Sequence, residues 1–229
     1  MEKDQSGFLI INKPLHYSSM DVIRVLRKLT GIKKIGHAGT LDPLATGVLL
    51  VCIGRATTKH IDSLMNMEKE YIAEIDLTAF SETDDAEGPL QECDVKNIPS
   101  ENEIIACLHK FIGLIEQIPP RYSAMKIQGV RAYKKVRSGE IFELEARMVE
   151  IKSIDLLSYQ WPVLKIKVTC GKGVYIRSLA RDIGNCLHTG GYLKSLIRSR
   201  IGEYRLENAL ELKFLQENTN LIEEKLSKI

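Results

Sequence analysis

A short segment near the N-terminus carries the side chains best suited to catalysis. Residues 36–47 read GHAGTLDPLATG, so that Asp42 stands before a proline and His37 stands five residues earlier. Glycine permits backbone angles that other residues resist, and a residue before proline is held extended or turned. A single carboxylate in such a tight loop suits a nucleophile or a general base in a partly desolvated cleft. The alternative is a purely structural Asx turn at Asp42 and Pro43.

A second segment combines cations with aromatic rings. Between residues 118 and 139 there is no acidic residue, and the cations and tyrosines are Arg121, Tyr122, Lys126, Arg131, Tyr133, Lys134, Lys135 and Arg137. Cations can contact phosphates, and tyrosine rings can stack on unpaired bases. The segment therefore favours RNA binding, with Arg198 and Arg200 as further contributors. The alternative is a basic face that meets only solvent.

Several segments of the chain resemble the TruB family of tRNA pseudouridine synthases. Residues 36–54 are similar to the signature loop of that family over nearly their whole length. Shorter likenesses lie at 12–14 (NKP), 69–71 (KEY), 119–129 (PxxYSAxKxxG), 170–177 (CxKGVYIR) and 190–200. The sequence departs from the family pattern at Val174, where a threonine is usual, and at Glu82, where an aspartate is usual. The resemblance covers about residues 8–210.

The resemblance assigns the chemistry to three side chains. Asp42 corresponds to the catalytic aspartate, Arg177 to the arginine that pairs with it, and Tyr71 to a tyrosine whose ring packs against the target base. By residue type alone, Arg177 could be a structural ion-pair partner and Tyr71 an ordinary core or edge tyrosine. Burial would oppose ionisation of Asp42, and an adjacent arginine would restore it through charge and hydrogen bonding.

The resemblance also implies a set of residues that touch the RNA. His37 would fill the space that the flipped base leaves, and Leu193 would pack beside the catalytic loop. The others are Lys13 and Pro14 in the cleft, Tyr175 at the ligand, and Arg121, Lys126, Arg131, Lys134 and Lys135 in an RNA-clasping insertion. Without the resemblance, a single histidine, a core leucine and a lysine beside a turn are more often structural.

The reaction that the resemblance implies converts uridine to pseudouridine at position 55, in the T-loop of tRNA. The bond between N1 and C1′ breaks, the base rotates, and C5 joins C1′, on a uridine that is flipped out of its stack. Asp42 could attack C1′, attack C6 or deprotonate the sugar. No cofactor or metal is expected. Three alternatives stay open: a carboxylate nucleoside hydrolase, a guide-RNA-dependent relative, and a tRNA-binding chaperone that uses the same cleft without catalysis.

Composition and charge bound the setting of this function. Hydrophobic residues make up 44% and charged residues 27% of the chain, which is ordinary for a soluble globular protein. The longest apolar run, 48–53, is too short to span a membrane, and five scattered cysteines without a C-x-x-C pair favour a reducing cytoplasm. Residues 61–110 carry 3 basic and 13 acidic side chains, whereas residues 111–205 carry 17 and 8. We therefore expect a cytoplasmic monomer that presents a basic face to the T-arm stem-loop of tRNA and does not bind a membrane.

Hydrophobic patterns and capping signals predict an α+β fold, with a mixed, largely antiparallel sheet flanked by helices and an active-site cleft. Strands are expected at 8–11, 48–53, 70–78, 149–157 and 164–170. Helices are expected to begin at Ser18 and Ser19 and end at Gly31, to begin after Ser100, and to begin after Arg177. A further short helix is expected after a cap at Thr57 or Thr58.

The expected domain organisation is simple. Residues 1–210 form a catalytic domain with the RNA-clasping insertion at about 118–147, and residues 211–229 form a helical tail. Common bacterial members of the family continue into a small RNA-binding module called PUA. The chain ends too early for that module, so a short form without it is expected.

Overall fold

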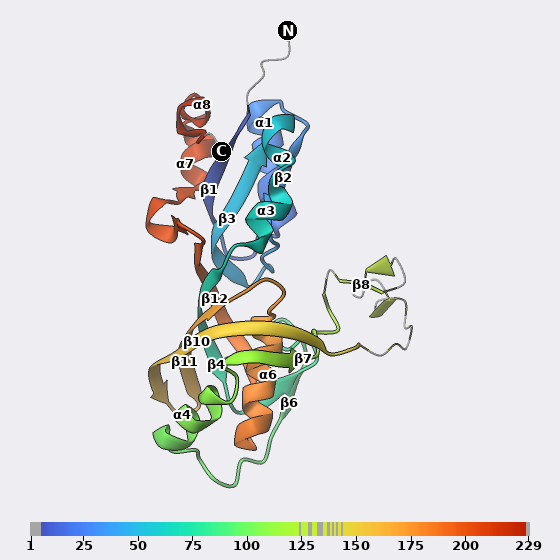
Figure 1. Ribbon diagram of the computed structural model, residues 1–229, viewed down its shortest axis with the longest axis vertical. Coiled ribbons are helices and arrows are strands. Elements are labelled where there is room, and N and C mark those ends of the chain that lie inside the picture. The colour runs from blue at the N-terminus through green and yellow to red at the C-terminus, as the bar shows by residue number, and fades with distance from the viewer. Residues whose placement is uncertain are drawn as a thin grey trace. The chain divides into compact units, whose positions relative to one another are not determined.

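The computed structural model describes residues 6–227, apart from residues 124, 128, 129, 132–134, 137, 139, 141 and 143. The chain divides into two compact units: Met1–Tyr71 with Leu196–Ile229, called the first unit here, and Ile72–Ser195, called the second unit. It passes between them within two strands, β4 (Lys69–Asp76) and β12 (Tyr192–Ile201). Figure 1 shows the elements of both units.

The first unit is built on strands in the order β14-β1-β3-β12, with β2 beside β3 and β13 beside β12. Strand β1 (Gly7–Lys13) runs antiparallel to β3 (Ala45–Ile53), and β12 runs parallel to β3. The others are β2 (Ile35–Ala38), β13 (Tyr204–Arg205) and β14 (Leu210–Glu211). The strands expected at 8–11 and 48–53 are confirmed.

Both faces of β3 are buried, which explains its unbroken apolar run. Leu49, Val51 and Ile53 pack with α1 (Ser19–Thr30) on one face. The alternate side chains of the strand, at 48, 50 and 52, pack on the other face with Leu64 of α3 (Ile61–Asn66). Because successive strand residues point to opposite faces, a strand covered on both sides must be apolar at every position.

Capping signals set the bounds of α1. Ser18 accepts a hydrogen bond from the Asp21 N–H, and the Asp21 carboxylate accepts one from the Ser18 N–H at 2.9 Å. Gly31 ends the helix at φ 72°, a left-handed angle that glycine adopts without steric cost. The prediction for this helix is confirmed. The predicted cap at Thr57 or Thr58 is wrong: Thr57 and Thr58 end α2 (Arg55–Thr58), and α3 begins after His60.

The C-terminal segment contributes to the core of the first unit. After a 3-10 turn at Leu206–Asn208, the helices α7 (Leu212–Glu217) and α8 (Leu221–Lys225) follow. Their side chains Leu212, Leu215 and Ile222 belong to the cluster that also holds α1 and β1. Within the tail expected at 211–229, the structure has helices at Leu212–Glu217 and Leu221–Lys225, and these two helices help to close one face of the sheet.

The second unit contains strands in the order β4-β11-β10-β7. Strands β10 (Arg147–Gln160) and β11 (Val163–Cys170) form the predicted hairpin, and β7 (Gly113–Gln117) pairs antiparallel with β10. Two short hairpins join β5 (Ala79–Ser81) with β6 (Leu90–Glu92) and β8 (Lys126–Ile127) with β9 (Val130–Arg131). The α+β class with a mixed, mostly antiparallel sheet is confirmed.

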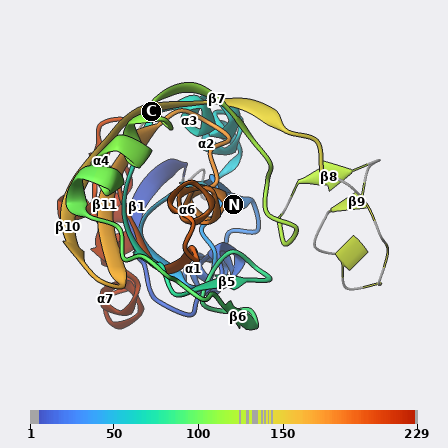
Figure 2. The ribbon, with the colours of Figure 1, turned by 90° about the horizontal axis from the view of Figure 1, so that it is seen from below.

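The second unit also contains helices. Helix α4 (Glu101–His109) begins with the predicted capping box of Ser100 and Glu103. Helix α6 (Ile176–Leu187) follows β11. Figure 2 looks along α6 and shows α4, β10 and β11 on one side of it, whereas the β8–β9 hairpin lies away from α4. Within the described residues, no helix is long and apolar enough to cross a membrane.

Candidate active site

Asp42 lies in the loop between β2 and β3. Its side chain is half-buried, and its carbonyl accepts a hydrogen bond from the Ala45 N–H at 3.1 Å. Gly39 before it has φ 90° and Gly47 after it has φ 100°, angles that side chains with a Cβ rarely adopt. The backbone of Asp42 therefore takes part in a turn, and the residue is only partly covered.

Ser19 anchors this loop immediately before Asp42. The Ser19 hydroxyl donates to the Leu41 carbonyl at 3.0 Å and accepts from the Leu41 N–H at 2.9 Å. Ser19 is only 2% exposed. Both backbone polar groups of Leu41 are thus satisfied by one buried side chain of α1. Sequence reasoning missed this role, because a serine at this position indicates only the start of a helix.

Lys13 anchors the loop on the other side of Asp42. Its buried ammonium donates to the carbonyls of Pro14 at 2.9 Å, Tyr17 at 2.5 Å and Pro43 at 3.5 Å. The prediction placed Lys13 against the RNA, and burial of its ammonium corrects this: the side chain holds the backbone on which Asp42 is carried. Pro14 is half-buried in the turn that Lys13 fixes.

Arg198 anchors the start of the loop. Its guanidinium donates to the carbonyls of Val48 at 2.7 Å, Gly39 at 3.1 Å and Thr40 at 3.5 Å, and the residue is 1% exposed. A Cβ on Gly47 would lie 2.3 Å from the carbonyl oxygen of Arg198, so the two strands approach closely here. The expectation that Arg198 contacts RNA is therefore wrong. Arg200 is also engaged, with Glu68 at 2.6 Å.

His37 lies on β2, before the loop. Burial, assisted by the charge of Arg198, lowers the pKa of His37 below its usual range, so the ring is neutral near pH 7. Its Nδ1 atom is buried and has no hydrogen-bond partner among the described residues. A neutral, partly apolar ring is suited to packing against a base. The role expected for His37 stays a prediction.

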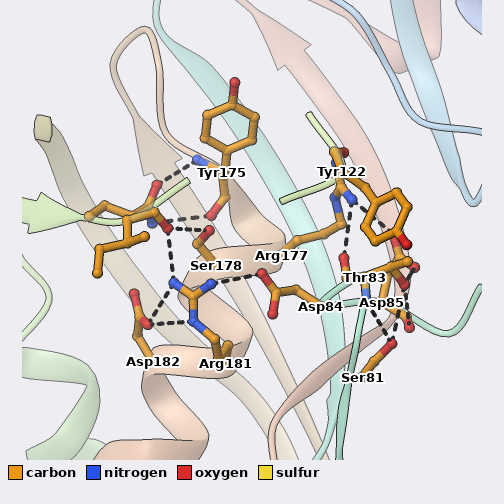
Figure 3. A network of polar contacts seen from close by, with 12 residues as sticks. Ser81, Thr83, Asp84, Asp85, Tyr122, Tyr175, Arg177, Ser178, Arg181 and Asp182 are labelled. Carbon is orange, nitrogen blue, oxygen red and sulfur yellow. Dashed lines mark hydrogen bonds and ion pairs between the residues drawn. The ribbon is translucent and has the colours of Figure 1, made fainter. Parts of the chain in front are cut away.

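Arg177 lies in the first turn of α6, which begins at Ile176, two residues earlier than expected from the sequence. It donates to the carbonyls of Thr83 at 3.1 Å and Tyr122 at 2.9 Å and pairs with the Asp85 carboxylate at 3.3 Å. Figure 3 shows its side chain directed at this group. The side chains of Arg177 and Asp85 are 7% and 2% exposed. The sequence assigned no role to Asp85, although the departure at Glu82 in the same turn was noted.

Arg181, one turn further along α6, forms a second set of contacts. It pairs with Asp84 at 2.8 Å and with Asp182 at 3.1 Å, and it donates to the Ile118 carbonyl at 2.9 Å. The same carbonyl accepts from the Ser178 hydroxyl at 2.8 Å. Burial raises the pKa of Asp84 to about 6, although Arg181 and Arg177 oppose the shift.

Tyr175 precedes α6 and is held by Gln117. The Gln117 amide donates to the Tyr175 carbonyl at 3.1 Å and accepts from the Tyr175 N–H at 2.8 Å. Leu193, 1% exposed, exchanges backbone hydrogen bonds with the acidic turn, to the Asp84 carbonyl and from the Ala86 N–H, each at 3.0 Å. Gln117 is therefore a further positioning residue that the sequence did not reveal.

The predicted RNA-clasping residues divide into three groups. Arg121 is exposed, as expected of a phosphate contact. Lys135 is 6% exposed and pairs with Glu140 at 2.5 Å, so the expectation that its ammonium meets RNA is wrong for this conformation. Lys134 and the side chains of Lys126 and Arg131 lie outside the described residues.

The predicted site residues are shared between the two units. Asp42, His37, Lys13 and Tyr71 belong to the first unit, and Arg177, Tyr175 and Leu193 to the second. Tyr71 lies on β4 and is 8% exposed. The pairing of Asp42 with Arg177 stays a prediction from the resemblance. Among the described residues, no group of three or more His, Cys, Asp or Glu side chains could hold a metal ion.

The chain is similar to known proteins over most of its length. A family model described as "TruB family pseudouridylate synthase (N terminal domain)" matches residues 27–176. A tRNA pseudouridine synthase B of Clostridium tetani is 44% identical over 213 residues, which are 93% of this chain and 73% of that protein. The protein of the same name from Phocaeicola vulgatus is 44% identical over 223 residues, 95% of this chain and 94% of that protein.

Solved structures share the fold. A chain in the crystal structure of a Cbf5-Nop10-Gar1 complex superposes with a TM-score of 0.74 and is 28% identical. The match covers 96% of this chain and 56% of that chain, so this chain spans little more than half of the solved one. The range of the family model includes Asp42 and Tyr71 and ends one residue before Arg177. The chain therefore belongs to the TruB family of pseudouridylate synthases.

Proposed function

We propose that this protein isomerises uridine to pseudouridine in tRNA and that Asp42 is its catalytic residue. Membership of the family and the names of the similar proteins from two bacteria support the reaction. The observation that carries the role of Asp42 is the way its loop is held. Buried donors from Arg198, Ser19 and Lys13 fix the carbonyls on both sides of a half-buried carboxylate. Such preorganisation keeps a reacting group in place without reordering during the reaction.

The chemistry requires one group that is anionic at neutral pH. The glycosidic bond from N1 to C1′ breaks, the uracil rotates, C5 bonds to C1′, and the proton on C5 leaves. An ionised Asp42 can serve by attacking C1′, by attacking C6 or by removing a proton from the sugar. We assign Arg177 to keep Asp42 ionised. The resemblance supports this assignment, because a guanidinium beside a carboxylate favours its ionised form through charge and hydrogen bonding.

The remaining site residues are assigned by resemblance to the handling of a flipped uridine. Tyr71 packs against the base, His37 fills the space that the base vacates, and Tyr175 contacts the ligand. The neutral state of His37 supports its part, because an uncharged ring replaces a stacked base without burying a charge. Leu193 supports the wall of the site through its bonds to the acidic turn.

We further propose that the substrate position is uridine 55, in the T-loop, and that one protein molecule acts on one tRNA in the cytoplasm. Sequence-specific RNA recognition prefers unpaired bases of loops, which can be splayed out and read. Arg121 and the segment around it would contact the phosphates of the T arm. A T-arm hairpin should therefore be modified nearly as well as full tRNA at low salt.

The decisive experiment uses an unmodified tRNA transcript with tritium at C5 of its uridines. Pseudouridine formation at a single position should release one equivalent of tritium, and sequencing of the modified site should place it at position 55. Free uracil would indicate a nucleoside hydrolase instead. Binding without tritium release would indicate a chaperone. The Asp42→Asn variant serves as the catalytic control.

A further inference from the structure

Four exposed side chains cluster just after β1, and the catalytic assignment leaves them without a role. Leu15, Tyr17 and Met20 are 48%, 37% and 43% exposed, and His16 between them is also exposed. Together they are called the Tyr17 cluster here. Large apolar and aromatic side chains at neighbouring exposed positions lose the stabilisation that burial would give them. A cluster of this kind calls for an explanation.

The backbone that carries the Tyr17 cluster is rigid. The buried ammonium of Lys13 bonds to the carbonyls of Pro14 and Tyr17, and the Tyr17 N–H donates back to the Pro14 carbonyl at 3.4 Å. The capping box of Ser18 closes the turn on its other side. Exposed side chains are thus presented on a fixed frame, which reduces the entropy lost when a ligand binds them.

His16 adds a strained conformation to this turn. Its φ of 66° lies in the left-handed region, where a residue with a Cβ is disfavoured relative to glycine. Strain of this kind persists where the surrounding structure over-determines it, and it is frequent at functional sites. A histidine at a position that glycine would occupy without strain points to a use for its ring.

The same turn is joined directly to the catalytic loop. The His16 N–H donates to the Pro43 carbonyl at 2.9 Å, and Lys13 reaches that carbonyl as well. Pro43 is the residue after Asp42. The Tyr17 cluster is thus carried on a turn that is bonded to the backbone next to Asp42.

We propose that the Tyr17 cluster is a stacking surface for an unpaired nucleobase next to the target uridine. This inference rests on the proposed function and deepens it, because it names where a flanking nucleotide of the RNA is held. Aromatic rings accept any base on their faces, so the surface favours an unstacked flanking base without reading its identity. Leu15 and Met20 would cover the edges of the stacked base.

The first test compares Tyr17→Ala with Tyr17→Trp in the full chain. The expected result is that Tyr17→Ala raises the Kd and KM for a tRNA transcript about tenfold, as for the loss of one stacked base, with kcat within about twofold. Tyr17→Trp should restore the parent values. Phe214→Ala is the matched control, because Phe214 on α7 is also an exposed aromatic residue of the first unit, at 40%. It should leave Kd and KM unchanged.

A second variant separates binding from folding. His16→Gly removes the ring and relieves the left-handed strain, so it should raise Tm by about 2–4 °C while weakening tRNA binding severalfold. A more stable protein that binds less well cannot be explained by unfolding. If the variant is stabilised and binds tRNA as tightly as the parent, His16 is not part of the stacking surface.

The position of the stacked base is tested with 2-aminopurine. T-arm hairpins carrying this fluorescent base directly before or after the target uridine should show quenching by the parent and by Tyr17→Trp at one of the two positions, and not by Tyr17→Ala. Unchanged Kd, KM and quenching in Tyr17→Ala would overturn the inference and leave the proposed function intact. A loss of kcat alone would also overturn it, since the turn would then only support Asp42. Absence of pseudouridine with the parent chain would instead contradict the proposed function, and the binding and fluorescence measurements would still decide the inference.

Discussion

At the scale of single residues, the loop that carries Asp42 is held by side chains that would otherwise be costly to bury. Lys13 and Arg198 are charged and almost fully buried, and their described hydrogen bonds go to backbone carbonyls. A buried cation without such partners would destabilise the fold, and the carbonyls of a tight loop would be left unpaired without the cation. The two requirements are met together at one place, which is the loop assigned to catalysis.

The first prediction concerns Asp42 itself. Asp42→Asn keeps the size of the side chain and removes its charge, so pseudouridine formation should be abolished while tRNA binding stays within about threefold. Tritium release and filter binding, measured on the same preparation, check both parts. If the variant turns over within tenfold of the parent rate, Asp42 is not the catalytic residue.

The second prediction concerns Arg198. Arg198→Lys keeps the charge, but a single ammonium nitrogen cannot take the places of the three guanidinium nitrogens that donate to Val48, Thr40 and Gly39. The free energy of unfolding should fall by about 1–3 kcal/mol, and kcat should fall on the order of 10- to 100-fold through misplacement of Asp42, with KM nearly unchanged. Arg27→Lys is the matched control, since Arg27 is exposed and, among the described residues, its side chain donates only to the Ile35 carbonyl. Equal effects of both variants on kcat would contradict the assignment.

At the scale of elements, α6 connects the acidic turn at 81–88 with the chain that leads into the insertion. Arg177 and Arg181 each bond to both segments, and Gln117 and Ser178 add further contacts between α6 and residues 117–118. The residues that are expected to act on the substrate, Arg177 and Tyr175, are therefore fixed to the segment that is expected to clasp it. A displacement of that segment would therefore also displace the side chains in the first turn of α6.

Gln117 tests this connection. Gln117→Met retains length and apolar bulk but removes both bonds to the Tyr175 backbone, leaving two polar groups unpaired. We expect a loss of about 1–3 kcal/mol in the free energy of unfolding and a lower kcat on tRNA. Urea titration and steady-state kinetics check the two effects. Gln91→Met on the exposed strand β6 should change neither, and a Gln117 variant with parental kcat would show that this anchor is not needed.

Asp84 gives this region a pH dependence. Its pKa is about 6 in the folded protein, against an ordinary value of 3.8 for an aspartate carboxyl, so the folded protein binds more protons than the unfolded chain between these values. Stability then falls as pH rises from about 4 to about 6 and is constant above, by about 3 kcal/mol in all. Asp84→Asn lacks this ionisation and should become more stable relative to the parent over the same range. Urea denaturation at pH 4, 5, 6 and 7 measures the difference, and a difference independent of pH would contradict the account.

At the scale of the whole molecule, most of the described cations that were considered for RNA binding are buried or paired with a carboxylate. Arg198 is buried, Arg200 is paired with Glu68, and Lys135 is paired with Glu140. Arg121 keeps an exposed side chain. Binding of a polyanion releases counterions in proportion to the phosphates neutralised, so only exposed cations should contribute to its salt dependence.

The salt dependence of tRNA binding separates these residues. Arg121→Ala should weaken binding and reduce the slope of log K against log salt by about 1. Lys135→Ala should leave the slope unchanged and lower stability instead, since it leaves Glu140 without its partner. Binding isotherms between low and moderate salt give both slopes. A reduced slope in the Lys135 variant and not in the Arg121 variant would show that the insertion exchanges its ion pairs on binding RNA.

The sequence by itself determined the features that depend on neighbouring residues. The capping boxes at Ser18 and Ser100 and the strands of the β10–β11 hairpin follow from residue types a few positions apart. The run 48–53 was identified as a buried strand because its apolar residues are consecutive. The family, and with it the catalytic assignment of Asp42, was recognisable because the loop at 36–54 is one contiguous segment.

Only the tertiary structure decided which polar side chains serve the loop and which face solvent. Ser19 and Leu41 are 22 residues apart, and Arg198 lies 150 residues from Val48. A lysine or arginine reads the same in the sequence whether it meets phosphate or a buried carbonyl, and the sequence therefore misplaced Lys13, Lys135 and Arg198. The environment of such a side chain depends on which strands pair. Strand β12, which carries Arg198, pairs with β3, although the residues of the second unit separate the two strands in the sequence. Long-range pairing, rather than local composition, sets the environment of a charge.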